Sequence, residues 1–270
     1  MELLKVNRDL CVKCGICAES CPNGIIGMED EGPKLLVANV CSACGHCVAV
    51  CPYAALDNTK TPLANQKEVA KFPVIDKKTA VDFLRSRRSI RCYKKEKLTK
   101  EQILELLDIA RYAPTGCNSQ GVSYRVVQDE AVLKKVTALT IDWMEEQIQN
   151  GVQWAQGFAG IVRFYRQTGV DVILREAPHL ILAIVPREFG MGHDNARFSL
   201  EYVELYATSL GLGTCWAGLA ELAVGAGYPP MLEVLNIPEG TVVVGAMMVG
   251  YPKYTYQRLV ERNPLSVTWL

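Results

Sequence analysis

The chain has 270 residues, with 29 lysines and arginines against 29 aspartates and glutamates, so its formal net charge is zero. This balance indicates neither a nucleic-acid partner nor an anionic membrane surface, and no apolar stretch approaches the length of a membrane span. The N-terminus lacks a charged region leading into a long apolar segment, so we expect a cytoplasmic protein. The length favours a small module joined to a larger one.

Cysteines open the chain in two runs of one spacing, C-x2-C-x2-C-x3-C-P, placed 30 residues apart. Three thiolates spaced in this way can wrap one iron–sulfur cube, while the fourth, followed by Pro, reaches the cube of the other run. The alternative is a pair of zinc sites, but these use one or two Cys-x2-Cys pairs rather than four cysteines followed by Pro. The spacing therefore predicts two [4Fe-4S] clusters.

The crossing of the fourth cysteine fixes the predicted ligand sets. One set is Cys11, Cys14, Cys17 and Cys51, and the other is Cys41, Cys44, Cys47 and Cys21. We predict that residues 1–57 form a ferredoxin-like domain that carries electrons. So small a domain cannot bury a sizeable apolar core, and the clusters must supply much of its folding free energy. Cysteines that bind clusters as reduced thiolates also favour a reducing compartment.

Residues 58–75 lack periodicity and are predicted to be a linker, which leaves residues 76–270 as a larger domain. Asp76 is a plausible N-cap, and Thr99 with Gln102 makes a capping box before a second helix. A half-buried strand is predicted at residues 124–127, and buried strands are predicted at residues 180–185 and 241–249. A long helix, capped by Asp194 or Asn195, is expected to end at Gly211.

A basic run at residues 85–91 joins the first of these helices to the next. Because alternate side chains of an extended segment share a face, Arg87, Ser89 and Arg91 can converge on one anion while Ile90 turns inward. The terminal phosphate of a mononucleotide such as FMN suits this set. The alternative is an ordinary solvated basic face. No Gly-x-Gly-x-x-Gly or P-loop motif is present, so a Rossmann dinucleotide site is not expected.

Five motifs of the larger domain follow one another in a set order. They are Arg-Arg-Ser-Ile-Arg at 87–91 and the segments 113–120, 211–218, 250–252 and 262–265. Together they resemble the nitroreductase family of flavoproteins over about residues 77–270. With the first 57 residues, the chain resembles the ferredoxin–nitroreductase fusions of anaerobic bacteria. The resemblance implies an α+β fold with a sheet flanked by helices, and an obligate homodimer with two FMN molecules at the subunit interface.

The same resemblance implies the flavin-binding residues. Arg87, Arg88, Ser89 and Arg91 match the phosphate-binding run, and Arg262 matches the basic residue that closes over the phosphate. The loop that reaches the flavin from the other subunit is matched by Pro114, Thr115, Gly116, Asn118 and Gln120. Ala217 and Gly218 match the backbone that faces flavin N5. No catalytic side chain is assigned.

Two features depart from the family pattern. Gly121 stands where many relatives have Pro, and no Asn and Lys pair precedes Ala177 to cover the flavin pyrimidine. Arg163, Arg166 and Arg175 are candidates for that place, although surface positions are more common for Arg. The aromatic-rich residues 141–175 occupy the place of the family's variable lid, with an ordinary core role as the alternative.

Three functions are compatible with these features. The first is an FMN-dependent reductase that receives electrons through the two [4Fe-4S] clusters and reduces a small organic acceptor, such as a nitroaromatic, a quinone or an activated alkene. Its donor would be reduced ferredoxin or NAD(P)H. The second is an NAD(P)H-oxidising flavoprotein that passes electrons out through the clusters to a protein partner. The third is an electron carrier or a flavin-holding protein without its own substrate. We favour the first, because a fused donor domain removes the need for soluble pyridine nucleotide.

Overall fold

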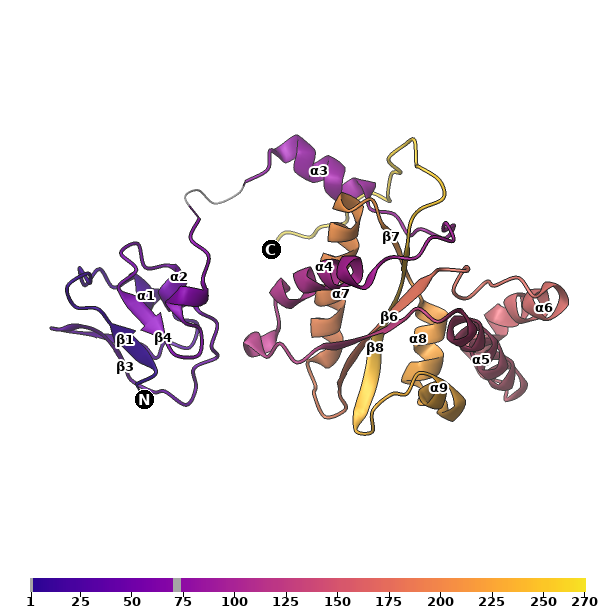
Figure 1. The fold of residues 1–270 in the computed structure, drawn as a ribbon, viewed down its shortest axis with the longest axis horizontal. Coiled ribbons are helices and arrows are strands. Elements are labelled where there is room, and N and C mark those ends of the chain that lie inside the picture. Colours follow the sequence, from indigo (N-terminus) through magenta and orange to yellow (C-terminus); the bar gives the residue numbers. More distant parts are fainter. Residues whose placement is uncertain (1, 70–73) are drawn as a thin grey trace. The chain divides into compact units, whose positions relative to one another are not determined.

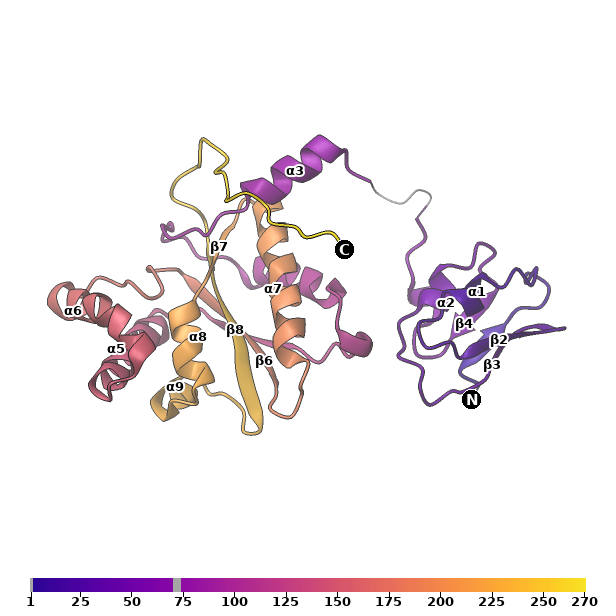
Figure 2. The same ribbon diagram turned by 180° about the vertical axis from the view of Figure 1, so that it is seen from behind.

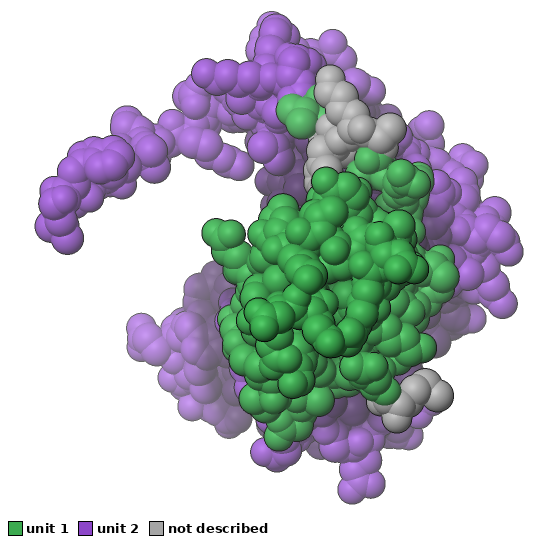
Figure 3. All heavy atoms as spheres, turned by 90° about the vertical axis from the view of Figure 1, so that its left-hand side faces the viewer, with its two compact units in different colours: residues 1–74, 117–119 green, residues 75–116, 120–270 purple. Residues whose placement is uncertain are grey.

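The computed structural model describes residues 2–69 and 74–270, so residues 70–73 of the predicted linker lie outside the described residues. The chain divides into two compact units, which Figure 3 distinguishes by colour. The first unit comprises Met1–Val74 with Cys117–Ser119, and the second comprises Ile75–Gly116 with Gln120–Leu270. The boundaries that the sequence suggested at residues 57 and 75 remain predictions.

The first unit repeats one small motif. Its elements are β1 (Leu4–Val6), α1 (Ile16–Glu19), β2 (Ile26–Glu29), β3 (Gly32–Leu35), α2 (His46–Ala49), β4 (Leu56–Asn58) and the 3-10 turn η1 (Leu63–Asn65). Strand β1 pairs antiparallel with β4, and β2 pairs antiparallel with β3. Gly15 and Gly45 precede α1 and α2 with φ of 80° and 74°, a left-handed conformation that glycine adopts without steric cost. The 30-residue repeat of the sequence is thus a structural repeat.

The apolar core of this unit is small. It centres on Leu4, Ile25, Ile26, Val48 and Leu56, with cysteines packed around them. A core of this size contributes little to stability, which agrees with the expectation that bound clusters complete the fold.

The second unit contains the longer elements of the chain. Its helices are α3 (Lys77–Ser86), α4 (Lys100–Asp108), α5 (Glu130–Gln149), α6 (Ala159–Thr168), α7 (Gly192–Ser209), α8 (Gly218–Gly225) and α9 (Pro229–Val234). The 3-10 turns are η2 (Ile109–Tyr112), η3 (Gly116–Asn118) and η4 (Gln153–Phe158). Its strands are β5 (Ser123–Val127), β6 (His179–Pro186), β7 (Gly213–Trp216) and β8 (Thr241–Gly250). They form one antiparallel sheet in the order β5-β6-β8-β7.

Helices cover both faces of this sheet (Figures 1 and 2). Along β6, Leu180 and Leu182 belong to the cluster that packs against α5, α8 and α9. Ile181 and Ala183 belong to the cluster on the other face, against α4 and α7. Burial on both faces explains why β6 and β8 read as continuous apolar runs. The α+β prediction of a sheet flanked by helices is confirmed.

Local helix signals were correct for two helices and wrong for a third. Asp76 caps α3 by accepting from the backbone N–H groups of Lys78 and Thr79, and the capping box of α4 is complete. Helix α7 begins at Gly192 rather than after Asp194 or Asn195. A tight turn, in which Gly192 N donates to Phe189 O at 2.8 Å, starts the helix earlier and leaves Asn195 buried within it. In the described part of the chain, no helix is both long and apolar enough to cross a membrane.

Candidate functional site

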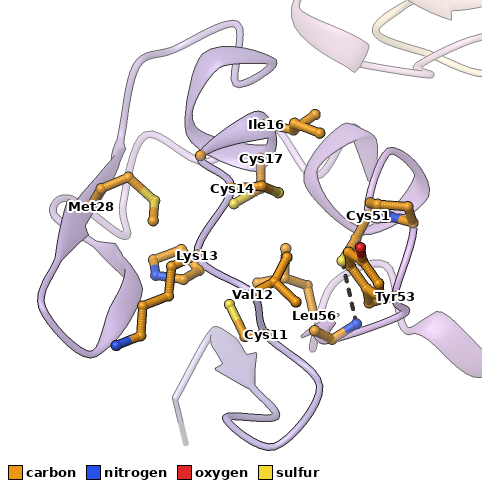
Figure 4. A pocket seen from close by; sticks show the side chains of 14 residues that line it. Cys11, Val12, Lys13, Cys14, Ile16, Cys17, Met28, Cys51, Tyr53 and Leu56 are labelled. Atoms are coloured by element: carbon orange, nitrogen blue, oxygen red, sulfur yellow. Dashed lines mark hydrogen bonds between the residues drawn. The ribbon is translucent and has the colours of Figure 1, made fainter.

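Four cysteines line one pocket of the first unit (Figure 4). They are Cys11, Cys14, Cys17 and Cys51, so three come from the first run and one from the second. Apolar side chains, among them Val12, Ile16 and Met28, complete the lining. Four sulfur donors with an apolar surround fit a [4Fe-4S] cube.

The remaining four cysteines of the two runs line a second pocket of the same unit. They are Cys21, Cys41, Cys44 and Cys47. This grouping supports the crossed ligand sets, which stay a prediction. Within the described residues, no three or more His, Cys, Asp or Glu side chains converge closely enough to hold a single metal ion. A cube does not require such convergence, because each cysteine binds a different iron.

The surroundings of the cysteines affect their thiols. Burial raises the pKa of Cys17 and of Cys47, so cluster binding must displace protons from these thiols. The backbone N–H of Ala55 donates to Cys51 Sγ at 3.3 Å. Hydrogen bonds to cysteine sulfur are one of the means by which a protein sets cluster potential.

The second unit holds a pocket of about 530 Å3 beside β7 and α8, which we name the Arg91 pocket. Its volume falls within the range of roughly 300–1,000 Å3 that is common for small-molecule sites. Charged and polar lining comes from Arg91, Arg175 and Glu221, and apolar lining includes Trp216 and Met248. Two guanidinium groups in one pocket favour an anionic ligand.

The edge of the sheet holds Arg91 in place. Ser89 forms a parallel bridge with Thr214 of β7, and Ile90 N donates to Thr214 O at 2.8 Å. The basic run thus extends along β7, and its last residue reaches the pocket. This placement agrees with the extended conformation that the sequence predicted for the run.

The other basic residues of the predicted phosphate site have different surroundings. Arg87 pairs with Glu204 of α7 at 2.8 Å, with side chains only 23% and 9% exposed. The guanidinium of Arg88 lies 5.3 Å from the ring centroid of Tyr256, and its Nε is buried with no hydrogen-bond partner among the described residues. Arg262 lies in the exposed C-terminal segment, residues 253–270. Of the predicted phosphate residues, only Arg91 lines the pocket.

The charged residues of the basic run and of the Arg91 pocket have features that suit FMN. A buried donor without a partner is costly, and Arg88 Nε is such a donor within the predicted phosphate run. Arg91 and Arg175 add positive charge to a pocket of suitable volume. The residues present therefore fit a phosphate-bearing flavin, whereas Arg87 would have to share its charge between a phosphate and Glu204.

The predicted flavin loop, residues 114–120, follows η2. Gly116 N donates to the Asn195 side chain at 3.0 Å, and Gln120 N donates to Thr115 Oγ1 at 3.2 Å. A Cβ at Gly116 would collide with Met191 Sδ, so a larger residue there would require the Met191 side chain to move. Within the first unit, to which residues 117–119 belong, Asn118 Nδ2 donates to the carbonyl groups of Ser42 and Ala43. Of the loop residues that belong to the second unit, 114–116 and 120, none lines the Arg91 pocket.

The predicted backbone site at the start of α8 lies at the Arg91 pocket. Gly218 lines the pocket, and the buried Ala217 precedes it as the N-cap of α8. Ala217 N donates to Ala246 O at 2.8 Å, which ties this point to β8. The sheet therefore fixes the backbone that the resemblance places near the flavin.

The aromatic-rich segment contributes less to the pocket than its composition suggested. Trp143 is buried, and Trp154 packs between Trp143 and Phe158 with centroid distances of 5.6 and 6.1 Å. These aromatic side chains form part of the packing around α5 and η4 and do not line the described pocket. Val172, Ile173 and Arg175, near the end of the segment, do line it.

Arg175 reaches the pocket because a short loop is held by Asp171. The Asp171 carboxylate accepts from the backbone N–H groups of Ile173, Leu174 and Glu176 at 3.0, 2.8 and 2.9 Å. Arg175 itself has a left-handed φ of 58°. The sequence identified Arg175 as a candidate but favoured a surface position. It is exposed and also lines the pocket.

Glu221 is a pocket residue that sequence reasoning missed. Its carboxylate accepts a hydrogen bond from Trp216 Nε1. Burial raises the pKa of the Glu221 carboxyl, although the Trp216 hydrogen bond and the charge of Arg197 act in the opposite direction. The signal that could have found it is helical spacing, because Glu221 lies one turn after Ala217, and its backbone N donates to Ala217 O.

Comparisons with known proteins match two separate parts of the chain, one in the first compact unit and one almost entirely in the second. Residues 84–251 match the nitroreductase family and residues 10–56 match the 4Fe-4S dicluster domain. An Archaeoglobus fulgidus protein that bears the name NADH dehydrogenase/NAD(P)H nitroreductase is 29% identical over 174 residues, covering 62% of this chain and 82% of the relative. A ferredoxin of Pyrobaculum islandicum is 32% identical over 69 residues, which are 25% of this chain and 64% of that ferredoxin.

A solved structure shows the same fold for the second unit. The crystal structure of a nitroreductase with bound FMN from Bacteroides fragilis has a TM-score of 0.55 at 19% identity, over 70% of this chain and 98% of that protein. At this identity the similarity establishes the fold alone.

Proposed function

Because the chain belongs to the nitroreductase family and carries an N-terminal 4Fe-4S dicluster domain, we propose that it reduces a small organic acceptor with FMN, using electrons received through two [4Fe-4S] clusters. Nitroaromatics, quinones and activated alkenes are the acceptor classes. The observation that carries this proposal is the presence in one chain of two four-cysteine pockets and the Arg91 pocket.

The proposed cofactors have identifiable ligands. Cys11, Cys14, Cys17 and Cys51 would hold one cluster, and Cys41, Cys44, Cys47 and Cys21 would hold the other. Arg88, Arg91 and Gly218 would contact FMN. When bound, the clusters supply one-electron transfer and FMN supplies hydride transfer.

The side chains of the pocket have separate tasks in this proposal. Arg91 and Arg175 bind and orient negative charge, because their guanidinium groups line the same space. Trp216 and Met248 give the pocket an apolar wall that limits water around the reacting atoms. The free thiols required as cluster ligands favour a cytoplasmic location.

A homodimer is part of the proposal. Within the second unit, residues 114–116 and Gln120 do not line the Arg91 pocket, which supports a role for them at the pocket of a second copy. The C-terminal segment also exposes large apolar side chains, with Leu265 88% and Trp269 89% exposed. Exposed apolar groups of this kind are commonly covered by a partner.

One observation favours the reverse direction of electron flow. The Archaeoglobus relative is named for NADH and NAD(P)H, and an NAD(P)H-oxidising flavoprotein would pass electrons out through the clusters. The two directions differ in the molecule that reduces the flavin first.

Anaerobic stopped-flow absorbance distinguishes the two directions. The cluster- and FMN-loaded protein is mixed separately with NADH, NADPH and reduced ferredoxin, and flavin bleaching is followed. We expect rapid bleaching by reduced ferredoxin, followed by reoxidation with 1,4-benzoquinone or 2-cyclohexenone. Rapid bleaching by a nicotinamide alone would reverse the proposed direction, and failure to bind FMN would refute the function.

A further inference from the structure

Glu221 has a position in the Arg91 pocket that the proposed function does not yet use. It lies in the first turns of α8, one turn beyond the Ala217–Gly218 backbone that is predicted to face the flavin. Its carboxylate is held by the indole N–H of Trp216, which also lines the pocket. An ionisable side chain is thus fixed in the pocket, close in sequence to the backbone that is predicted to face the flavin.

Reduction of an acceptor X=Y to HX–YH requires two electrons and two protons. A hydride delivers both electrons and one proton, and the second proton must come from an acid. For an activated alkene, hydride addition leaves an enolate whose carbon must be protonated. For a quinone, hydride addition leaves a phenolate-type anion, which can leave the pocket and take a proton from water. The need for a positioned acid therefore depends on the acceptor.

We propose that Glu221 is the proton donor in acceptor reduction, an inference that rests on the proposed function. The neutral carboxyl gives its proton to the atom of the acceptor that does not receive the hydride, so one O–H bond breaks and one C–H bond forms. The resulting carboxylate keeps the Trp216 hydrogen bond and recovers a proton from solvent. The electrons come from reduced FMN, so the carboxyl changes only its protonation.

The charges around Glu221 are compatible with this role. The charge of Arg197 of α7 acts on the carboxyl, and Arg91 and Arg175 line the same pocket. The charge of Arg197 and the hydrogen bonds from Trp216 and from the Ala246 backbone favour the carboxylate, whereas burial favours the neutral acid. Burial is the largest influence and raises the pKa of Glu221 above the ordinary value of 4.5. A general acid works best when its pKa lies closer to the operating pH.

The first test compares two acceptors in single-turnover reactions of the loaded, reduced protein. In Glu221→Gln we expect 2-cyclohexenone reduction to fall by roughly 100-fold, within the usual range for general acid catalysis, while 1,4-benzoquinone reduction changes less than about threefold. A Gln oxygen can still accept the Trp216 N–H. A purely structural role for Glu221 would therefore leave both rates near the wild-type values, which would overturn the proposal.

The pH profile adds a second criterion. Wild-type 2-cyclohexenone reduction should slow as pH rises through the pKa of Glu221, and Glu221→Gln should remove this dependence. Trp216→Phe keeps the acid but removes a hydrogen bond that stabilises the carboxylate, so its profile should move to higher pH. Glu233→Gln, an exposed glutamate on α9, serves as the matched control and should behave as wild type.

A measurement without turnover separates this inference from the proposed function. Trp216 fluorescence in the full-length, FMN-free protein should titrate with a midpoint above pH 4.5, the ordinary value for Glu. The transition should vanish in Glu221→Gln and in Trp216→Phe. A wild-type protein that reduces neither acceptor would refute the proposed function. A Trp216 titration at or below the ordinary Glu value would instead refute the role of Glu221.

Discussion

Replacing Glu204 by Gln changes the charge balance at the predicted phosphate site. Glu204 of α7 accepts a 2.8 Å ion-paired hydrogen bond from Arg87, and the two side chains are only 9% and 23% exposed. In the FMN-free protein this carboxylate neutralises Arg87. If the flavin phosphate binds beside Arg87, the same carboxylate opposes it. Glu204→Gln should therefore lower the stability of the FMN-free protein and strengthen FMN binding.

The expected magnitudes follow from the burial of the pair. Exposed ion pairs contribute about 0–1 kcal/mol, and breaking a buried pair costs about 3–5 kcal/mol. A mostly buried pair that retains a neutral hydrogen-bond acceptor lies between these limits, so we expect a loss of about 2 kcal/mol in the free energy of unfolding. Removal of one repelling charge near a phosphate is worth about 1 kcal/mol, or roughly a fivefold lower Kd.

Urea unfolding and FMN titration measure the two effects. All four tryptophans of the chain lie in the second unit, so their fluorescence reports its unfolding. Glu146→Gln, an exposed position on α5, is the matched control and should change neither quantity. Weaker or unchanged FMN binding in Glu204→Gln would show that the phosphate does not bind beside Arg87. Unchanged stability would show that the ion pair contributes nothing.

Three further perturbations test the rest of the site and the core. Cys14→Ala should lose about half of the iron, because one of two clusters loses a ligand, while the exposed Cys92→Ala should keep its full iron content. Arg91→Ala should raise the Kd for FMN at least tenfold in fluorescence titration, and equal affinity in this variant and in Arg163→Ala would contradict the pocket assignment. Burial, with a smaller effect of a nearby lysine charge, lowers the pKa of His179 from 6.5 to about 4, so the unfolded chain binds the proton more readily. The contribution of His179 to the free energy of unfolding should be fully present above pH 6.5 and should fall by about 3 kcal/mol as the pH drops toward 4. In urea unfolding, His179→Gln should remove this dependence on pH.

Local sequence patterns predicted three helices and three strands of the second unit, and they did not place α5, α6, α8, α9 or β7. The Thr99 capping box, the Asp76 cap and the apolar runs of β6 and β8 depend on residues that are close together in the chain, and each was found where the pattern placed it. The start of α7 was missed because a turn closed by backbone hydrogen bonds preceded the side chains that resembled a cap.

The sequence by itself determined the two cysteine runs, the family and the order of the domains, because these depend on residue type and spacing along the chain. Tertiary structure decided which charged groups share a space. Arg87 pairs with Glu204, which is 117 residues away, so a residue predicted to bind phosphate already has a counter-ion. Glu221 lies in α8 and Arg175 lies in the loop before β6, and only packing against the sheet brings them to one pocket with Arg91. The pairing of Arg87 with Glu204 and the approach of Arg175 to Arg91 depend on long-range packing, which leaves no periodic signal in the sequence.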